Sequence, residues 1–248
     1  MELLGIDIGG SGIKGAIINT ETGGLISERH RIPTPESATP ESISKVVKEL
    51  IEHFNWKAAV GCSFPSIVRD GKCYSASNIS KAWIGTQIDV LFSKQCGGIP
   101  FYVANDADLA GFAEITLGAG KEKKGTVVMI TIGTGIGSGV YFNGELIPNV
   151  ELGQLFYIDG KPIEHFAADS ARKREDLKLS KWAKRLDFFL NHAKLILSPD
   201  CFILGGGISK KFEKFKEELM VDVPIEVAHF KNNAGIIGAA MLAHQRIK

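Results

Sequence analysis

Two glycine-rich segments of the chain contain the residue types that bind phosphate through the backbone. The first is Gly9-Gly10-Ser11-Gly12 and the second is Gly133-Thr134-Gly135-Ile136-Gly137, and each stands between two runs typical of β-strands. Glycine adopts backbone angles that are closed to other residues, so amide N–H groups can converge on an anion with no side chain in the way. We therefore predict two hairpins whose turns bind phosphate groups.

The first segment also satisfies the G-x-G-x-x-G pattern of dinucleotide-binding proteins, through Gly10, Gly12 and Gly15. That pattern requires a helix directly after the loop. Residues 16–20 are instead largely apolar and β-branched, and another turn follows at 21–24. Strand–turn–strand is therefore the better interpretation. Neither glycine segment ends in G-K-[ST], so a Walker-type phosphate loop is absent.

Asp106 is the strongest catalytic candidate. It follows the buried run 101–104 and begins a predicted helix over about 106–117, so its carboxylate stands where a strand ends and a helix starts. Phosphoryl transfer to an alcohol needs positioned phosphates and a carboxylate that accepts the hydroxyl proton. The alternative is a helix cap, because aspartate is favoured at helix starts. With a glycine hairpin on either side of it in the chain, Asp106 indicates a phosphotransfer cleft shared by two related lobes.

Asp7 precedes the first glycine segment at the end of a predicted strand. Its carboxylate could orient a phosphate group or hold Mg²⁺ through water. The alternative is an aspartate that only accepts hydrogen bonds from turn amides. The second hairpin favours the phosphate role.

Carboxylates and amides scattered over the chain are suited to binding neighbouring hydroxyl groups of a sugar. Each of them could equally be a solvated loop residue. The candidates are Asn78, Asn105, Glu151, Gln154 and Glu164.

Gly205-Gly206-Gly207 lies between a predicted strand and a predicted helix from Ser209. Glycine amides at a helix N-terminus favour an anion, although a plain strand-to-helix turn is an equal alternative.

Basic side chains gather in one stretch of the second half. Residues 172–185 hold seven basic and two acidic side chains, a local net charge of +5, and Lys121, Lys123 and Lys124 form another cluster. Such patches attract polyanions in a salt-dependent way. The alternative is a solvated helix face.

The bulk composition indicates a cytoplasmic globular protein. The chain has 248 residues, 44% hydrophobic residues and a net charge of +1, which fits two small domains or one large one. No apolar stretch approaches the length of a membrane span and no secretory leader is evident, so we expect no membrane partner. The net charge of +1 gives no overall attraction to nucleic acid, so no nucleic-acid partner is expected. The four cysteines are scattered without metal-ligand spacing and are expected to be reduced, mostly buried thiols.

Strand and helix patterns alternate in both halves, which predicts a mixed α/β sheet in each of two lobes. In the first half, strands are expected over about 2–8, 12–19, 24–32, 58–62 and 101–104, with helices near 43–54 and 106–117. In the second half, we expect a hairpin over 126–142, helices near 164–174 and 180–197, a strand at 201–204, a helix from Ser209, and a final helix from Ala234 to His244 capped by Asn232-Asn233.

Together these motifs resemble the ROK family of sugar kinases, and within it the polyphosphate glucokinase branch. The resemblance runs over nearly the whole chain, and the combination of motifs is what makes it specific. The matching segments are 7–15, 63–65, 83–86, 105–108, 133–139, 163–171, 204–211 and 232–240.

The resemblance implies an α/β fold, the two-lobed actin-like (ribonuclease H-like) sugar kinase fold with an interlobe cleft. The small lobe would be residues 1–105 with the C-terminal helix 234–248 packed on it, and the large lobe residues 106–233. The implied activity is phosphoryl transfer from inorganic polyphosphate, or ATP, to the 6-hydroxyl of glucose. Mg²⁺ would travel with the donor, near Asp7, and a homodimer is implied.

The resemblance also assigns roles to residues. Asp106 would be the catalytic base. The implied sugar-binding residues are Pro65, Asn78, Asn105, Asp106, Glu151, Gln154 and Glu164. The implied donor-binding residues are Asp7, Gly9, Gly10, Ser11, Gly12, Lys14, Thr134, Gly135, Gly137 and Gly206.

Two departures from the family pattern affect these expectations. The usual cysteine-rich zinc motif is missing, as it is in the polyphosphate branch, so no structural zinc is expected. Gln154 stands where the branch has a histidine; glutamine also donates and accepts hydrogen bonds, but its reach and charge differ.

Two alternatives therefore stay open. One is an ATP-dependent kinase for another hexose or an aminosugar. The other is a non-catalytic sugar-binding regulator, as in the ROK repressors, although the added helix-turn-helix of those proteins has no room here because the first strand is expected to begin near residue 3.

Overall fold

The computed structural model describes residues 1–77 and 79–247, which form two compact units. Unit 1 comprises Met1–Ala113 with Asn233–Lys248, and unit 2 comprises Glu114–Asn232. The chain passes from unit 1 to unit 2 between Ala113 and Glu114, which is later than the expected lobe boundary at 105/106. The reason is that α3 (Asp106–Leu117) begins in unit 1. There it packs tightly on α7 (Ala234–Arg246), since a Cβ on Gly238 would lie 1.8 Å from the carbonyl oxygen of Leu109.

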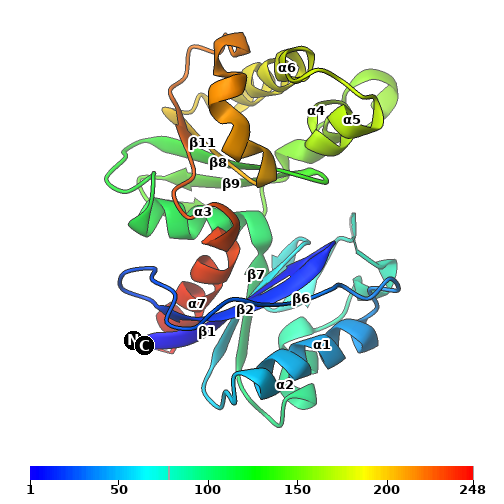
Figure 1. Cartoon of the computed structure of the whole chain (residues 1–248), viewed down its shortest axis with the longest axis vertical. Coiled ribbons are helices and arrows are strands. Elements are labelled where there is room, and N and C mark those ends of the chain that lie inside the picture. The colour runs from blue at the N-terminus through cyan, green and yellow to red at the C-terminus, as the bar shows by residue number, and fades with distance from the viewer. Residues whose placement is uncertain (78, 248) are drawn as a thin grey trace. The chain divides into compact units, whose positions relative to one another are not determined.

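Unit 1 is built on a five-stranded sheet in the order β3-β2-β1-β4-β7, of which Figure 1 labels β1, β2 and β7. β1 pairs antiparallel with β2, whereas β1, β4 and β7 run parallel. The carboxyl ends of these three strands therefore meet at one edge of the sheet. The strands are β1 (Glu2–Gly9), β2 (Gly12–Asn19), β3 (His30–Ile32), β4 (Val60–Phe64) and β7 (Phe101–Asn105).

The third predicted strand, over 24–32, is shorter than expected. Only His30–Ile32 forms a ladder with β2, and Leu25 makes one isolated bridge to Ile18. Between them the hydroxyl of Ser27 accepts the Ile17 N–H at 3.0 Å. A side chain thus satisfies the backbone group that a regular strand partner would have taken.

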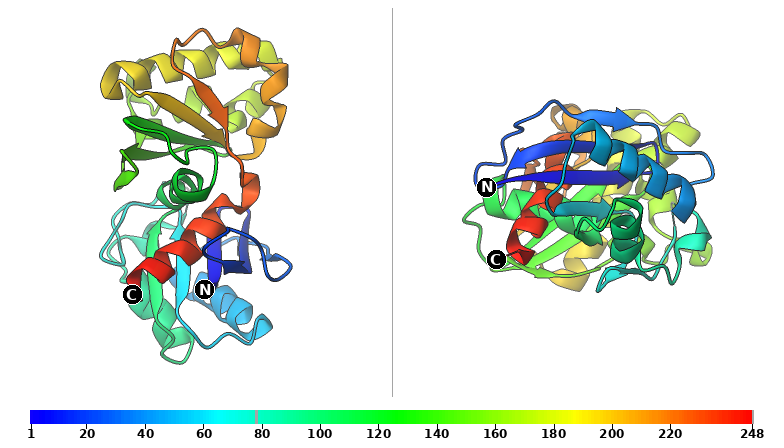
Figure 2. Two further views of the ribbon diagram at one scale, coloured as in Figure 1. Left: turned by 90° about the vertical axis from the view of Figure 1, so that its left-hand side faces the viewer. Right: turned by 90° about the horizontal axis from the view of Figure 1, so that it is seen from below.

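Helices cover both faces of the unit 1 sheet. Alternate residues of β1, such as Leu4 and Ile6, join the apolar core with α1 (Pro40–His53) and α2 (Ile88–Gln95). Figure 1 and Figure 2 both show α7 beside β1, on which it packs backbone to backbone, because a Cβ on Gly5 would lie 2.0 Å from the Ile236 carbonyl oxygen. Side chains alternate along a strand, so Asp7 lies on the same face of β1 as Gly5.

Unit 2 repeats the strand order of unit 1, as β10-β9-β8-β11-β12. Here too an antiparallel hairpin leads into parallel strands. The prediction of a mixed α/β sheet in each half is therefore confirmed. The strands are β8 (Thr126–Ile132), β9 (Ile136–Phe142), β10 (Glu145–Ile147), β11 (Cys201–Gly205) and β12 (Ile225–Val227).

The core of unit 2 lies between its sheet and α6 (Leu179–Leu197). Val128 and Ile130 of β8 join Trp182 and Leu186 of α6 in one cluster of buried residues. The helix predicted over 164–174 is divided into α4 (Glu164–Ala167) and α5 (Asp169–Arg174), because Ala168 is extended with ψ 160°.

Two predictions about helix ends are wrong. The segment after Gly206 is a 3₁₀ helix, η4 (Gly207–Lys214), rather than an α-helix from Ser209. Asn233 precedes α7 but makes no side-chain cap bond, and its carbonyl oxygen Oδ1 instead accepts a hydrogen bond from Arg29.

Short elements complete the chain. They are β5 (Val68–Arg69), β6 (Lys72–Cys73) and the 3₁₀ helices η1 (Lys81–Trp83), η2 (Leu152–Gln154), η3 (Ile158–Gly160), η5 (Lys216–Glu218) and η6 (Lys231–Asn233). All four cysteines are free and buried, as predicted. Within residues 1–77 and 79–247, no helix combines the length and apolar character that crossing a membrane requires.

Candidate functional site

The first group of candidate residues lies at the carboxyl edge of the unit 1 sheet. Asp7 at the end of β1 pairs with Ser63 on β4, and Asn105 at the end of β7 pairs with the last residue of β4. Pro65 and Asp106 follow directly on these two strands. Open α/β sheets bind ligands outside the carboxyl ends of their parallel strands. The fold therefore brings the predicted base and the predicted first donor residues to the edge where a ligand is expected.

Asp7 is held by two side chains rather than by turn amides. Lys14 Nζ donates to Asp7 Oδ2 at 2.9 Å, and Ser63 Oγ donates to Asp7 Oδ1 at 2.6 Å. The pair is only partly exposed, with 23% of the Lys14 side chain and 16% of the Asp7 side chain accessible. Burial, assisted by the charge of Asp7, raises the pKa of the neighbouring Cys62 thiol. Asp7 thus fixes a lysine ammonium on the strand that leaves the first glycine turn.

Side chains from the segment after β2 hold the carbonyl groups of the first turn. Thr34 Oγ1 donates to the carbonyl oxygen of Gly9 at 2.5 Å, and Arg31 Nη2 donates to that of Ser11. A Cβ on Gly12 would lie 2.5 Å from Arg31 Nε. Arg31 was not among the predicted site residues. No sequence pattern indicated Arg31, because its place beside Lys14 follows from the pairing of β2 with β3.

Asn105 and Asp106 divide two tasks at the start of α3. Asn105 Oδ1 accepts the N–H groups of Ala107 and Asp108 at 2.9 and 3.0 Å, so Asn105 caps the helix. Its Nδ2 donates to the carbonyl oxygen of Ser66 at 3.0 Å. Asp106 is more exposed than the buried Asn105 and accepts the Ala107 N–H at 2.8 Å through one carboxylate oxygen. Asn105 therefore bonds two amides of the first turn of α3, whereas Asp106 bonds one of them.

The loops after β4 hold the remaining predicted sugar residues of unit 1. Pro65 is half-buried beside Ser66. Asn78 lies outside the residues that the structure describes. Trp83, in the matching segment 83–86, is fully buried and donates its indole N–H to the Ala38 carbonyl oxygen at 2.8 Å.

The second glycine turn occupies the equivalent edge of the unit 2 sheet. Ile132 pairs with Ile136, so the turn consists of residues 133–135, and Gly137 pairs with Thr131. Gly206 follows β11 with φ 79°, and a Cβ there would lie 2.2 Å from the Ile132 carbonyl oxygen. Glycine is thus required at 206 for both its conformation and its close approach.

Ser170 of α5 contacts the second turn, and the sequence did not single it out. Its backbone N–H donates to the Gly133 carbonyl oxygen at 3.1 Å, and its Oγ donates to the Thr134 carbonyl oxygen at 2.6 Å. Thr134 is exposed. The predicted donor turn is therefore fixed by a neighbouring helix.

Three predicted sugar residues gather behind the same turn. Glu164 is only 8% exposed; its Oε2 accepts the Ile136 N–H at 3.0 Å, and its Oε1 accepts a hydrogen bond from Gln154 Nε2 at 2.8 Å. Burial, and secondly the charge of Glu164, raise the pKa of Glu151. The structure thus brings Glu151, Gln154 and Glu164 into one polar cluster of unit 2.

Close packing fixes this polar cluster against β9. A Cβ on Gly153 would lie 2.1 Å from the Ile136 carbonyl oxygen. Ser138 Oγ accepts the Leu152 N–H at 2.8 Å and donates to the Val150 carbonyl oxygen. The segment that carries Glu151 and Gln154 therefore follows the strand that leaves the turn.

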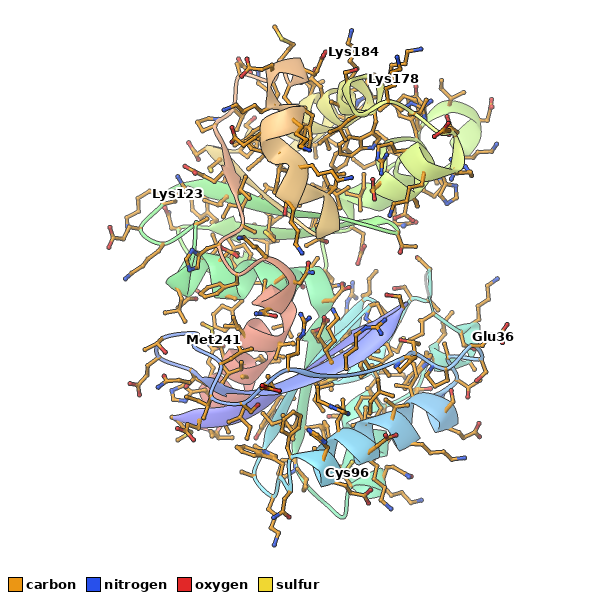
Figure 3. All side chains as sticks on the ribbon, viewed as in Figure 1. Glu36, Cys96, Lys123, Lys178, Lys184 and Met241 are labelled. Carbon is orange, nitrogen blue, oxygen red and sulfur yellow. The ribbon has the colours of Figure 1, made fainter. Side chains whose placement is uncertain are left out.

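Ion pairs neutralise much of the basic stretch 172–185. Asp169 pairs with Arg172 and Lys173, and Glu175 pairs with Arg174 and Arg185. Lys184 lies 4.0 Å from Glu218, whereas no ion pair involves Lys178 or Lys181 within the described part of the chain. Figure 3 shows Lys178 and Lys184 extending outward from the ribbon of unit 2. The cations that remain for a polyanion are those at the start of α6.

Comparisons with known proteins agree with these motifs. The model of the ROK family matches residues 3–151. The polyphosphate glucokinase of Mycobacterium tuberculosis is 44% identical over 237 residues, which cover 96% of this chain and 89% of that protein. The N-acetylmannosamine kinase of Salmonella typhi is 26% identical, with 98% of each chain covered.

Solved structures show the same fold. The inorganic polyphosphate/ATP-glucomannokinase of Arthrobacter sp. strain KM matches with a TM-score of 0.94 and 44% identity, covering 98% of this chain and 99% of that one. A ROK family glucokinase of Streptomyces griseus, solved with glucose and AMPPNP, matches with a TM-score of 0.84 at 21% identity, covering 99% and 100% of the two chains. The fold is the α/β two-lobed actin-like fold of these kinases.

Proposed function

The chain belongs to the ROK family, and we propose that it is a kinase that transfers the terminal phosphoryl group of inorganic polyphosphate to the 6-hydroxyl of glucose. The observation that carries this proposal is 44% identity to a polyphosphate glucokinase over 96% of the chain. ATP is the second donor, because the Arthrobacter protein of similar structure is a polyphosphate/ATP-glucomannokinase.

The reaction assigned to Asp106 is general-base catalysis. Its carboxylate accepts the proton of the 6-hydroxyl while the sugar oxygen forms a bond to the terminal phosphorus. The bond from that phosphorus to the bridging oxygen breaks, and the shortened polyphosphate leaves with the electron pair. A positioned base contributes a factor of roughly 10²–10⁴ to the rate. The capping of α3 by Asn105 supports this role, because it fixes the backbone of Asp106.

The donor is assigned to the two glycine turns and their neighbours. In unit 1 the cations Lys14 and Arg31 lie along the first turn, and in unit 2 the amides of Thr134 and Gly135 belong to the second. Phosphoryl transfer depends mainly on such positioning and charge stabilisation. The exposed Lys178 and Lys181 would attract the rest of a long polyphosphate chain.

Mg²⁺ is assigned to the donor rather than to a protein cage. Within residues 1–77 and 79–247, no three His, Cys, Asp or Glu side chains group as metal ligands do. Both oxygens of Asp7 already accept hydrogen bonds. Mg²⁺ commonly keeps several waters and binds through substrate phosphates, and it neutralises their charge.

The sugar is assigned to residues of both units. Pro65, Asn78, Asn105 and Asp106 would contact it from unit 1, and Glu151, Gln154 and Glu164 from unit 2. The bond between Gln154 and Glu164 supports a shared role, because it fixes the amide with its carbonyl oxygen still available to a sugar hydroxyl.

A matrix of donors against sugars tests the proposal. Polyphosphate and ATP are each combined with glucose, mannose, fructose, N-acetylglucosamine and N-acetylmannosamine, and sugar phosphate formation is measured. We expect the highest kcat/KM for polyphosphate with glucose. Activity with ATP alone, or with an aminosugar alone, would favour the alternative kinase. Sugar binding without any phosphoryl transfer would favour a regulator.

The proposal includes a homodimer located in the cytoplasm. Sedimentation velocity of the purified protein would measure its oligomeric state. Fractionation of cells that produce the protein would determine its location.

A further inference from the structure

Ser170 donates two hydrogen bonds to consecutive carbonyl groups of the second glycine turn. The N–H of Ser170 binds the Gly133 oxygen at 3.1 Å, and its hydroxyl binds the Thr134 oxygen at 2.6 Å. These bonds fix two successive peptide units of the turn. Ser170 itself is half-buried in the second position of α5.

These two bonds also set the direction of the next two N–H groups of the turn. In a planar trans peptide, the C=O of one residue and the N–H of the next point in opposite directions. Holding the Gly133 carbonyl toward Ser170 therefore turns the Thr134 N–H away from α5. Holding the Thr134 carbonyl in the same way turns the Gly135 N–H away from α5 as well.

The amides directly before and after these two are already occupied. The Gly133 N–H donates to the Gly135 carbonyl oxygen at 3.0 Å, and the Ile136 N–H donates to Glu164 at 3.0 Å. Thr134 and Gly135 are the residues of this turn whose N–H groups have no hydrogen-bond partner within the described chain. They are the same two amides that Ser170 orients.

We propose that Ser170 is a positioning residue for the phosphoryl donor, which orients the Thr134 and Gly135 amides so that both donate to oxygens of one phosphate group. This inference rests on the proposed function, in which the second turn binds the donor. Successive amides that point the same way form a concave anion site, and glycine at 135 keeps side chains out of it. The hydroxyl of Ser170 does not touch the donor in this scheme.

Its own helix holds Ser170 in place. Asp169, directly before it, is 6% exposed and binds Arg172 Nε at 2.6 Å and Lys173 Nζ at 2.8 Å. Burial alone would raise the pKa of Asp169, but the hydrogen bonds from Lys173 and Arg172 outweigh it and lower the pKa. These bonds anchor the first turn of α5 without the serine hydroxyl, so removing that hydroxyl is expected to leave the helix intact.

The experiment compares three variants in steady-state kinetics with polyphosphate and glucose. Ser170→Ala removes the hydroxyl bond and keeps the backbone N–H bond. Ser170→Thr keeps the hydroxyl. Ser180→Ala is the matched control, because Ser180 is the second residue of α6 in the same unit and makes no hydrogen bond through its hydroxyl within the described chain.

We expect Ser170→Ala to raise the KM for polyphosphate about three- to tenfold, as the loss of one hydrogen bond implies. The KM for glucose in Ser170→Ala should stay within about twofold of that of the unmodified protein. Ser170→Thr, which keeps the hydroxyl, should have the donor KM of the unmodified protein, and so should Ser180→Ala. An unchanged donor KM in Ser170→Ala would overturn the inference, as would an equal rise in both KM values. Lack of activity in the unmodified protein would instead reject the proposed function.

Discussion

The two glycine turns occupy equivalent places in sheets of the same strand order, but their surroundings differ. Beside the first turn lie a lysine and an arginine, with Lys14 fixed by Asp7 and Arg31 bound to the turn itself. The second turn is held by the neutral Ser170, and the carboxylate of Glu164 binds the amide that follows the turn. One fold pattern thus presents charged side chains in one unit and oriented backbone amides in the other.

This difference assigns two different physical effects to the turns. Ionic attraction by partly exposed cations weakens as salt is added, because mobile ions screen it. Hydrogen bonds from oriented amides act at contact distance and depend much less on salt. Within the proposed function, added salt should therefore weaken donor binding by the first turn more than donor binding by the second.

Asp106→Asn is the variant that should have the largest effect, and it tests whether the chemistry depends on an acid of unit 1. We expect kcat to fall at least about a hundredfold, because asparagine cannot accept the hydroxyl proton. Circular dichroism and glucose binding, followed by tryptophan fluorescence, should be unchanged.

The control for that variant is Asp70→Asn. Asp70 is an exposed acid of unit 1 with φ 48°, a conformation that asparagine also tolerates. Its kcat should equal that of the unmodified protein. Near-normal turnover in Asp106→Asn would reject the assignment of the base.

Lys14→Met should have the next largest effect and tests the charged turn directly. We expect kcat/KM for polyphosphate to fall about ten- to a hundredfold, because a charge-assisted contact is lost and Asp7 is left without its cation. Loss of the Lys14 ammonium should also make the KM for polyphosphate less sensitive to salt. Ser170→Ala should leave that salt sensitivity unchanged.

Adding Asp7→Asn to Lys14→Met sharpens this test. The double variant removes the unpaired carboxylate and keeps an acceptor for Ser63, so it should recover part of the lost kcat/KM. If Ser170→Ala and Lys14→Met change the salt dependence equally, the distinction between the two turns is wrong.

Glu151→Gln should have the smallest effect, and it concerns the stability of unit 2. The folded protein holds the proton of Glu151 more tightly than the unfolded chain does, because burial and Glu164 raise its pKa. Its contribution to stability is therefore fully present below the ordinary glutamate pKa and is lost as the pH rises through the raised value. Ionisation of Glu151 therefore costs more in the folded protein than in the unfolded chain, and glutamine, which does not ionise, should remove this pH-dependent loss of stability.

The expected result is a Tm higher by about 2–4 °C at pH 7.5, with a smaller difference at pH 4.5. Differential scanning calorimetry at both pH values would measure it, with the exposed Glu145→Gln as the control. A gain that is larger at the lower pH would contradict the direction of the pKa shift.

Local patterns were sufficient to predict the hairpins and the strand ends. The glycine spacing at 9–12 and 133–137 predicted both turns, and the position of Asp106 at a strand end was readable because the apolar run 101–104 ends there in polar residues. The side chains that hold the turns were not predicted. Arg31 and Ser170 reach the turns only through strand pairing and helix placement, which depend on contacts between distant parts of the chain.

Competition among local interactions explains the other differences. Ser27 interrupts a predicted strand by bonding to Ile17, and Asn105 rather than Asp106 provides the main cap of α3. Asn233 was expected to cap α7, but Arg29 takes its side-chain oxygen. Ser27 and Asn233 thus bind partners that are distant in the sequence, whereas Asn105 caps α3 through bonds to the residues two and three positions later.

The placement of α7 has a consequence for how the protein is made. Unit 2 is one continuous segment, whereas unit 1 needs α7, which follows unit 2 in the chain, to close one face of its sheet. The close backbone contacts at Gly5 and Gly61 cannot form until α7 has left the ribosome. Domains tend to fold as they are synthesised. The unit that begins first during translation is therefore the last to be completed, and an interrupted nascent chain would contain a finished unit 2 beside an open sheet.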